Sequence, residues 1–216
     1  MGSRYERISG AVGDEFAGGH VRNYRAFLRE DNHMRRKGEP IRVLHIVTRM
    51  NTGGVAVLIA NLMRNFDPRE INARLLTGSC DSSEEDYLEK VARDIPFTKI
   101  PSLRRAISPI KDIFAFFALA KEIRQFKPDV IHTHTSKAGL IGRIAGLVSA
   151  PKAKRIHTFH GHLLDGYFSK FNTALLVKFE FLLAKKTDRM IAMGNQVKLD
   201  LLAAGVGREN QFSVFF

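Results

Sequence analysis

IRVLHIVT, residues 41–48, is a nearly continuous run of apolar and β-branched side chains. Such a run is typical of a strand that is buried on both faces, as strands of a parallel sheet are. Asn51-Thr52-Gly53-Gly54 follows, and Val55–Asn65 then places its apolar side chains at helical spacing. The stretch therefore predicts a buried strand, a glycine turn and a helix.

The same alternation continues along the chain. Ser82 and Glu85 form a capping-box pattern, and Ser108-Pro109 is a helix start. Strands that alternate with helices of 10–18 residues predict an α/β fold, a single Rossmann-like domain over residues 41–216 with a parallel, doubly wound sheet. Such sheets bind ligands beyond the carboxyl ends of their strands. We expect further strands at 70–76, 96–100, 129–133, 154–158, 189–192 and 211–216, and helices at 82–93, 109–126, 136–149, 168–186 and 196–204.

Residues 1–40 differ from the rest of the chain in composition. Gly, Arg and Glu dominate there, and the apolar residues show only weak periodicity. Only residues 21–37 read as a short basic helix. We expect an appendage that is either disordered or a loosely docked helix.

Composition bounds the class of protein. The 216 residues include one cysteine, Cys80, so a reducing, cytoplasmic location is expected. No apolar run approaches the roughly 18–20 residues that span a bilayer. The net charge is +12, and residues 108–216 carry 16 basic and 8 acidic side chains. Such a basic surface attracts anions, meaning nucleic acid, anionic lipid headgroups or phosphorylated substrates.

The glycine turn is a candidate phosphate site. Gly53 and Gly54 allow a ligand to approach the backbone, and the following helix offers unpaired N–H groups and the positive end of its dipole. The turn is not a G-x-G-x-x-G fingerprint, and Gly78-Ser79 stands where a dinucleotide fold carries its ribose-binding acid. NAD binding is therefore not expected, and a simple tight turn is the alternative.

Histidines gather after two later strands. His134 stands at the carboxyl edge of its strand, where it can hydrogen-bond sugar hydroxyls together with Thr135, while Lys137 can meet phosphate charge. His132 is expected to lie deeper and to serve packing. The run His160-Gly161-His162 follows the next strand. No cysteine or carboxylate joins these histidines, so no metal is expected.

The segment Leu163–Arg189 combines a wide apolar face with Lys170, Lys178, Lys185 and Lys186. A cationic amphipathic helix of this kind can lie in the interface of an anionic membrane. It can equally be a core helix with a solvated basic rim. Peripheral contact with the inner membrane face is therefore one expectation for this segment.

Four motifs in order and in register resemble family 4 glycosyltransferases, in particular their N-terminal, acceptor-side domain, one half of a GT-B fold. These motifs are VLHIVTRMNTGGVAVLIANL, KPDVIHTHTSKAGLIGRIAG, KRIHTFHGH and RMIAMGNQVKLDLLAAGV, and the likeness covers about residues 41–216.

The resemblance implies a retaining transferase that uses a nucleotide-sugar donor and needs no cofactor or catalytic metal. It implies that Gly53 and Gly54 approach the donor diphosphate, and that His134 contacts the transferred sugar near the reacting centre. It also implies that His160, Gly161 and His162 lie near the acceptor. Many members of the family build cell-surface polysaccharide or glycolipid at the inner membrane face, so a glycan or a lipid-linked acceptor is expected.

The 216 residues depart from the family's pattern because they do not include the donor-binding second domain with its pair of glutamates. We therefore expect the chain to be inactive alone, with that domain supplied by another chain if it acts. The alternatives are a sugar-nucleotide epimerase of GT-B architecture and a non-catalytic basic α/β module that binds membrane or nucleic acid. Nucleic acid is disfavoured because the chain has no Trp and four Tyr, and because its basic residues are spread through helices rather than interleaved with aromatic residues on strands.

Overall fold

The computed structural model describes residues 38–161 and 170–215, together with Tyr24. In this part of the chain a seven-stranded sheet runs in the order β3-β2-β1-β4-β5-β6-β7, with every neighbouring pair parallel. Its strands are β1 Ile41–Val47, β2 Ile71–Thr77, β3 Phe97–Lys99, β4 Val130–His134, β5 Lys154–Phe159, β6 Arg189–Met193 and β7 Phe212–Phe215.

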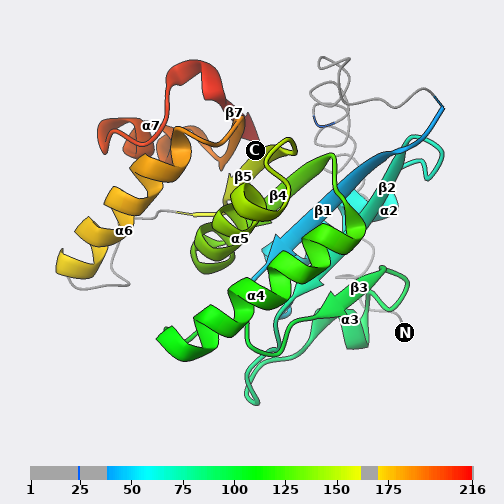
Figure 1. The fold of residues 1–216 in the computed structure, drawn as a ribbon. Coiled ribbons are helices and arrows are strands. Elements are labelled where there is room, and N and C mark those ends of the chain that lie inside the picture. The colour runs from blue at the N-terminus through cyan, green and yellow to red at the C-terminus, as the bar shows by residue number, and fades with distance from the viewer. Residues whose placement is uncertain (1–23, 25–37, 162–169, 216) are drawn as a thin grey trace, which may run out of the picture.

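Helices cover both faces of this sheet. In Figure 1, α4 and α5 run side by side across the front of the sheet, and α2 lies behind it. The helices are α2 Gly54–Arg64, α3 Tyr87–Lys90, α4 Pro109–Phe126, α5 Ser136–Ser149, α6 Lys170–Ala184 and α7 Asn195–Ala203, with a 3₁₀ turn at Glu209–Gln211.

The predicted fold class is confirmed, and each strand end lies within one residue of its predicted position. The helices α4 and α5 have the predicted bounds. The order of the strands reverses between β1 and β4, which are neighbours in the sheet although β2 and β3 separate them in sequence. This is the switch point at which a doubly wound sheet opens a crevice for ligands.

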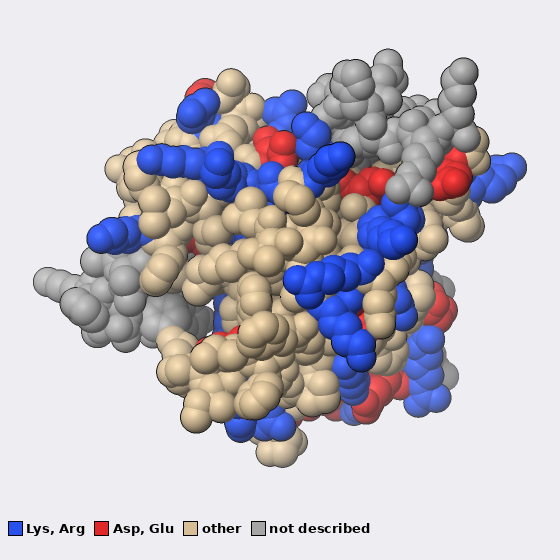
Figure 2. Space-filling model, in the orientation of Figure 1, with Lys and Arg blue, Asp and Glu red and all other residues tan. Residues whose placement is uncertain are grey.

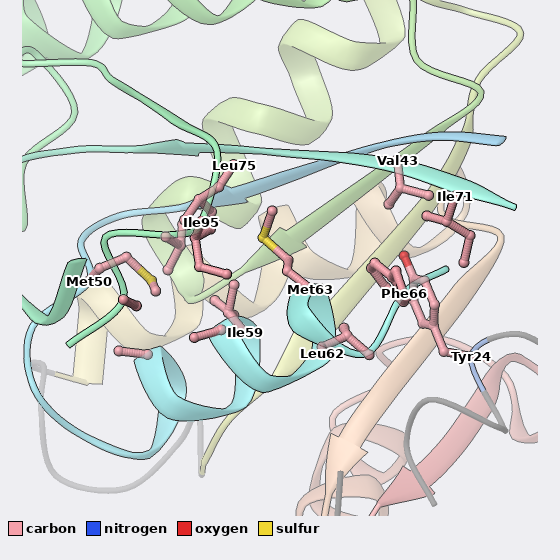
Figure 3. Packing of buried hydrophobic residues seen from close by; sticks show 14 of the residues in the cluster. Tyr24, Val43, Met50, Ile59, Leu62, Met63, Phe66, Ile71, Leu75 and Ile95 are labelled. Atoms are coloured by element: carbon pink, nitrogen blue, oxygen red, sulfur yellow. The ribbon is translucent and has the colours of Figure 1, made fainter. Parts of the chain in front are cut away.

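Side chains of β1 alternate between two cores. Val43 and Val47 pack with α2 and Tyr24, whereas Leu44 and Ile46 pack with α4 and α5. Figure 3 shows the first core, with Ile59 and Met63 of α2 pointing at the sheet. Burial on both faces explains why this strand reads as a continuous apolar run.

The capping box predicted for residues 82–93 is wrong. The helix there, α3, has four residues, and Asp86 caps it by accepting a hydrogen bond from the backbone N–H of Leu88. The backbone of Glu85 instead accepts a hydrogen bond from Thr52, and Tyr87 N–H donates to Met50. Pairing with the loop after β1 keeps these residues out of a helix.

Two predicted helices fall wholly or partly outside the described residues. The basic helix predicted at 21–37 does so except for Tyr24, which is helical and only 2% exposed. The helix predicted at 168–186 is described from Lys170, and it ends at Ala184. A buried ion pair joins α6 to α5, since Arg143 Nη2 donates to both carboxylate oxygens of Glu180 at 2.7 and 2.6 Å. Among the described residues, no helix is long and apolar enough to cross a membrane.

Candidate functional site

The predicted site residues meet at the carboxyl edge of β1, β4 and β5. The glycine turn follows β1, Thr135 follows β4, and His160 follows β5, so three neighbouring strands deliver them to one edge. Gly53 and Gly54 are exposed. A Cβ on Gly54 would meet nothing within 4 Å, and one on Gly53 only the Asn51 carbonyl oxygen at 3.9 Å. The fold itself therefore has room for a side chain there.

The glycine turn also presents the N-terminus of α2, for which no side chain serves as a cap. The first N–H groups of a helix have no partner within it, and they can bind a phosphate. The turn is held in place by Thr52 N–H, which donates to Glu85 at 2.9 Å. This geometry suits the predicted diphosphate contact.

Thr135 links β4 to the start of α5 in a strained conformation. Its φ is 63°, a left-handed value that is uncommon for a β-branched residue and costs about 1–3 kcal/mol. Its hydroxyl lies 2.7 Å from the hydroxyl of Thr48, which also accepts a hydrogen bond from Ala138 N–H in the first turn of α5. Strain of this kind clusters at functional sites.

Three histidines form a hydrogen-bonded chain across the sheet. Nδ1 of His134 lies 3.1 Å from Nε2 of His160, and Nε2 of His134 lies 3.1 Å from Nδ1 of His45. His45 and His134 are buried, whereas His160 is partly exposed. The chain thus runs from the partly exposed edge of the sheet into its interior.

His132 lies beside this chain. Its Nε2 is 2.8 Å from the Thr158 hydroxyl, and its ring stacks on Tyr24 with centroids 5.3 Å apart. It is 1% exposed, and His134 is also 1% exposed. The two rings are therefore equally inaccessible to solvent, although His132 lies two residues further from the carboxyl end of β4.

Burial keeps all of these imidazoles neutral. It lowers the pKa of His45 to about 3 and that of His160 to about 4. It also lowers the pKa of His132, His134 and His157 well below the usual value. The neighbouring imidazoles, which repel one another when protonated, add to the effect, and Arg143 adds to it at His157. The cause is that a charged ring loses its hydration when it is buried. At neutral pH these rings act as hydrogen-bond donors and acceptors rather than as cations.

One tautomer of the histidine chain is favoured. Among the described residues, Nε2 of His45 has no hydrogen-bond partner. A buried lone pair without a partner costs less than a buried N–H without one. His45 therefore carries its proton on Nδ1 and donates to His134, which in turn donates from Nδ1 to Nε2 of His160. This leaves His160 protonated on Nδ1, as the donor at the exposed end.

Ring nitrogens of His45, His132 and His134 lie within 4.8 Å of one another, a spacing that a transition metal could use after small shifts. Both ring nitrogens of His134, however, already lie in hydrogen bonds to His45 and His160, so an ion bound to His134 would have to displace one of them. The expectation that the protein needs no metal stays a prediction.

The remaining predicted residues differ in their surroundings. The Lys137 ammonium binds the carboxylate of Asp112 and the carbonyl oxygen of Ala106, so its charge is already balanced within the protein. Gly161 is exposed. His162 lies outside the described residues.

Sequence reasoning missed His45, Thr48 and Tyr24. The alternation of β1 places His45 on the same face as Val43, and the sheet pairs it with His132. This pairing depends on β1 lying beside β4, and no local pattern in the sequence predicts that strand order. Tyr24 carried no signal, because its segment lacks apolar periodicity.

A hollow lies at the opposite edge of the sheet from the candidate site. A cavity of about 570 Å³ is lined by the beginnings of β1, β4 and β5 and by the ends of α4 and α5, including Arg42, Arg124, Lys127 and Lys152. It lies away from every predicted site residue.

Comparisons with known proteins agree with the fold and the motifs. The profile of Glycosyltransferase Family 4 matches residues 52–211. Over 113 residues, 52% of this chain, the sequence is 34% identical to the UDP-Gal:alpha-D-GlcNAc-diphosphoundecaprenol alpha-1,3-galactosyltransferase of Escherichia coli, of which 28% is covered.

Two solved structures share the fold. The lipopolysaccharide outer core galactosyltransferase WaaB is similar with a TM-score of 0.61 and 15% identity, over 81% of this chain and 45% of its own. A UDP-N-acetylglucosamine 2-epimerase is similar with a TM-score of 0.61 and 17% identity, over 82% of this chain and 48% of its own. The chain spans less than half the length of each of these three proteins.

Proposed function

Because the chain belongs to glycosyltransferase family 4, we propose that it supplies the acceptor-side half of a retaining glycosyltransferase. This enzyme transfers a sugar from a nucleotide-sugar donor to a glycan or lipid-linked acceptor in the synthesis of cell-surface polysaccharide or glycolipid. The observation that carries the proposal is the hydrogen-bonded pair His134 and His160 at the ends of neighbouring strands, beside the open N-terminus of α2.

The donor diphosphate binds at Gly53 and Gly54. The N–H groups at the start of α2 face the negative charge that grows on the leaving group, which is the charge a transferase must stabilise. Both glycines are exposed and leave open space above the backbone. No metal is needed in this scheme, since helix dipole and backbone donors supply the positive field.

His134 acts at the transfer centre as a neutral hydrogen-bonding group, together with His160. Because both ring nitrogens of His134 are already engaged, it must exchange its hydrogen bond to His160 for one to the substrate. His45 is a positioning residue, because its hydrogen bond to Nε2 of His134 decides which nitrogens of the pair carry protons. Gly161 and His162 extend the acceptor side. Thr135 and Lys137 complete the substrate contacts, and Lys137 must then exchange the carboxylate of Asp112 for a substrate group.

The test of His134 uses an active two-domain enzyme that carries this chain as its first half. His134→Ala and the better-filling His134→Gln should each lower kcat by about 10²-fold, the scale of one lost transition-state hydrogen bond. A matched control is His157→Gln, since His157 is equally buried but packs against Gly139 of α5 on the other face of the sheet. It should reduce stability while leaving kcat per folded molecule unchanged. Full activity in both His134 variants contradicts the proposal.

The glycine turn has a separate test. Gly53→Val fits the folded chain, because the φ of Gly53 is extended and its nearest non-neighbouring atom lies 3.9 Å from a new Cβ. Stability should therefore stay unchanged while kcat/KM falls, since the branched side chain occupies the path of the diphosphate. An unchanged kcat/KM would mean that the glycine turn only connects β1 to α2 and does not contact the donor.

The third test concerns the 216-residue chain by itself. Since it spans less than half of its relatives, we propose that it transfers no sugar alone and binds UDP- or GDP-sugars with a Kd no tighter than about millimolar. Micromolar affinity in calorimetry contradicts this. A sugar-nucleotide epimerase is the second candidate, since the fold matches the epimerase as well as the transferase. Consumption of nucleotide sugar by the two-domain enzyme without an acceptor would favour it.

A further inference from the structure

The cavity of about 570 Å³ at the beginnings of β1, β4 and β5 has the size of a ligand site. Cavities that bind small molecules in proteins usually measure roughly 300–1,000 Å³. Its walls are the last residues of α4 and α5, together with the turns that lead from these helices into β4 and β5. The sheet separates it from the candidate site, so it is a second place at which this protein can hold a ligand.

The charged side chains around this cavity are mostly basic. One acid, Asp129, lines it, and this carboxylate is already paired because Nε and Nη2 of Arg42 each lie 3.4 Å from one of its oxygens. In the part of the chain that the structure describes, no carboxylate pairs with the other three bases, which are exposed. These bases are Arg124, Lys127 and Lys152. Figure 2 shows blue groups on the right side of the molecule, where α4 ends in Figure 1.

The ends of the two helices do not balance this charge. The C-terminus of a helix carries about half a negative charge, and both α4 and α5 end at the cavity. Two helix ends thus supply about one negative charge, against three positive charges from the bases that have no carboxylate partner. About two positive charges remain, and these attract an anion.

The backbone holds one of the three bases in an unfavourable conformation. Lys127 follows α4 with φ 51° and ψ 58°, in the left-handed region where glycine is the usual residue after a helix. Pro128 comes next, and a residue before proline normally adopts an extended conformation. The turn by itself therefore gives no reason for a lysine at this position, whereas a ligand in the cavity does.

Hydrogen bonds fix the walls of the cavity. The carboxylate of Asp129 accepts a hydrogen bond from the backbone N–H of Arg42 at 2.8 Å, and Ala153 N–H donates to the carbonyl oxygen of Ala150 at 3.0 Å across the turn before β5. The wall also holds a polar atom that the described residues leave unsatisfied, because Oγ of Ser149 is buried without a hydrogen-bond partner. The cavity is thus formed before a ligand arrives.

We propose that this cavity binds a small soluble anion that carries two or more phosphate groups. Three bases without carboxylate partners suit several negative groups in one ligand, because a charge-assisted hydrogen bond to phosphate is stronger than a neutral one. No aromatic side chain stands among the described residues that line the cavity, so none is there to stack on a nucleobase. A polyphosphate or a sugar bisphosphate therefore fits better than a nucleotide. The inference does not rest on sugar transfer.

The test is calorimetry of the 216-residue chain with inorganic triphosphate at about 150 mM salt, where diffuse surface charge is largely screened. We expect one site with a Kd of about 0.1 mM or tighter. Glycerol 3-phosphate carries a single phosphate, as the headgroup of a simple anionic lipid does. It should bind at least about tenfold more weakly, because it cannot engage all three bases.

Three substitutions remove the bases with little change to the backbone. Lys127→Asn introduces a residue that tolerates the left-handed conformation, and Arg124→Gln and Lys152→Gln retain long polar side chains. Each should weaken triphosphate binding by about three- to fivefold, and the three together by about thirtyfold or more. Lys111→Gln is the matched control, because Lys111 is exposed at the other end of α4, and it should change the affinity by less than about twofold.

A second control excludes the candidate site, since the N-terminus of α2 also offers donors to a phosphate. Gly53→Val should leave the affinity for triphosphate unchanged, and circular dichroism checks that each variant is folded. The proposal is overturned if the chain fails to bind triphosphate at about 10 mM, or if glycerol 3-phosphate binds equally well. It is also overturned if Lys111→Gln weakens binding as much as the cavity variants do, or if Gly53→Val abolishes binding that the cavity variants retain.

Discussion

Lowering the pH from 7.5 to 5.5 should destabilise this protein steeply, because five histidines are held neutral inside it. Burial lowers the pKa of His45 to about 3 and of His160 to about 4, and it lowers those of His132, His134 and His157 well below the usual value. In the unfolded chain each ring titrates near its ordinary pKa of about 6.5. Over this pH range the histidines therefore bind protons in the unfolded state but not in the folded state.

The sign and size follow from proton linkage. A group whose folded pKa is depressed below its unfolded pKa favours unfolding by about 1.4 kcal/mol per pH unit once the pH is below about 6.5. Integrated from pH 7.5 to 5.5, each histidine removes about 1.4 kcal/mol, so five remove about 7 kcal/mol. That is comparable with the whole stability of a typical domain, about 5–15 kcal/mol. The Asp94 carboxyl does not change this balance, since Arg64 holds its pKa near 2 and the stability of that pair is lost only below about pH 4.

Urea denaturation at pH 7.5, 6.5 and 5.5, followed by circular dichroism, measures this loss directly. His132→Gln provides an internal control, because it removes one buried titrating ring and should reduce the loss between pH 7.5 and 5.5 by about 1.4 kcal/mol. A total loss below about 1.4 kcal/mol, the effect of a single histidine, would refute the reasoning. It would mean that the rings are hydrated and protonate in the folded state.

Three further predictions concern the same interior. Glu180→Ala should destabilise the chain by about 3–5 kcal/mol in urea denaturation, since it leaves Arg143 buried without its partner, and adding Arg143→Met should recover most of the loss. Gly139→Ala should lower the free energy of unfolding by about 1–3 kcal/mol in the same assay, because the new Cβ would lie 2.4 Å from the ring of His157. Gly54→Ala is the control and should change stability little, because its Cβ would have no atom within 4 Å. Dialysis against a chelator should leave the thermal midpoint unchanged, and a fall of several degrees would indicate that the histidines hold a metal.

The fold could be predicted from sequence because its information is local. Parallel strands that are buried on both faces carry near-continuous apolar runs, so β1, in which only Arg42 and His45 are polar, stands out without knowledge of its neighbours. The bounds of α4 and α5 followed from their start signals and periodicity. The prediction failed at α3, where the loop after β1 pairs with residues 85–87 and overrides the local capping pattern.

From the sequence, the candidate site could be predicted only as residues at the ends of certain strands, without the contacts between them. Local alternation placed His134 at the right edge, and the glycine turn at a helix start was visible in the residues themselves. The sequence gives no signal for the partner of Lys137, because Asp112 lies 25 residues away on another helix. Nor could it reveal that His134 is as buried as His132.

The sequence by itself therefore determined the layer architecture, the order of its elements and the strand ends at which ligand chemistry gathers. Only the tertiary structure decided that β1 lies against β4 with His45 opposite His132, so that His45 joins the chain of His134 and His160. The physical reason is that strand order and register depend on contacts between residues nearly ninety positions apart. Periodicity reports which face of an element is buried, whereas the neighbour that buries it is chosen by the packing of the whole domain.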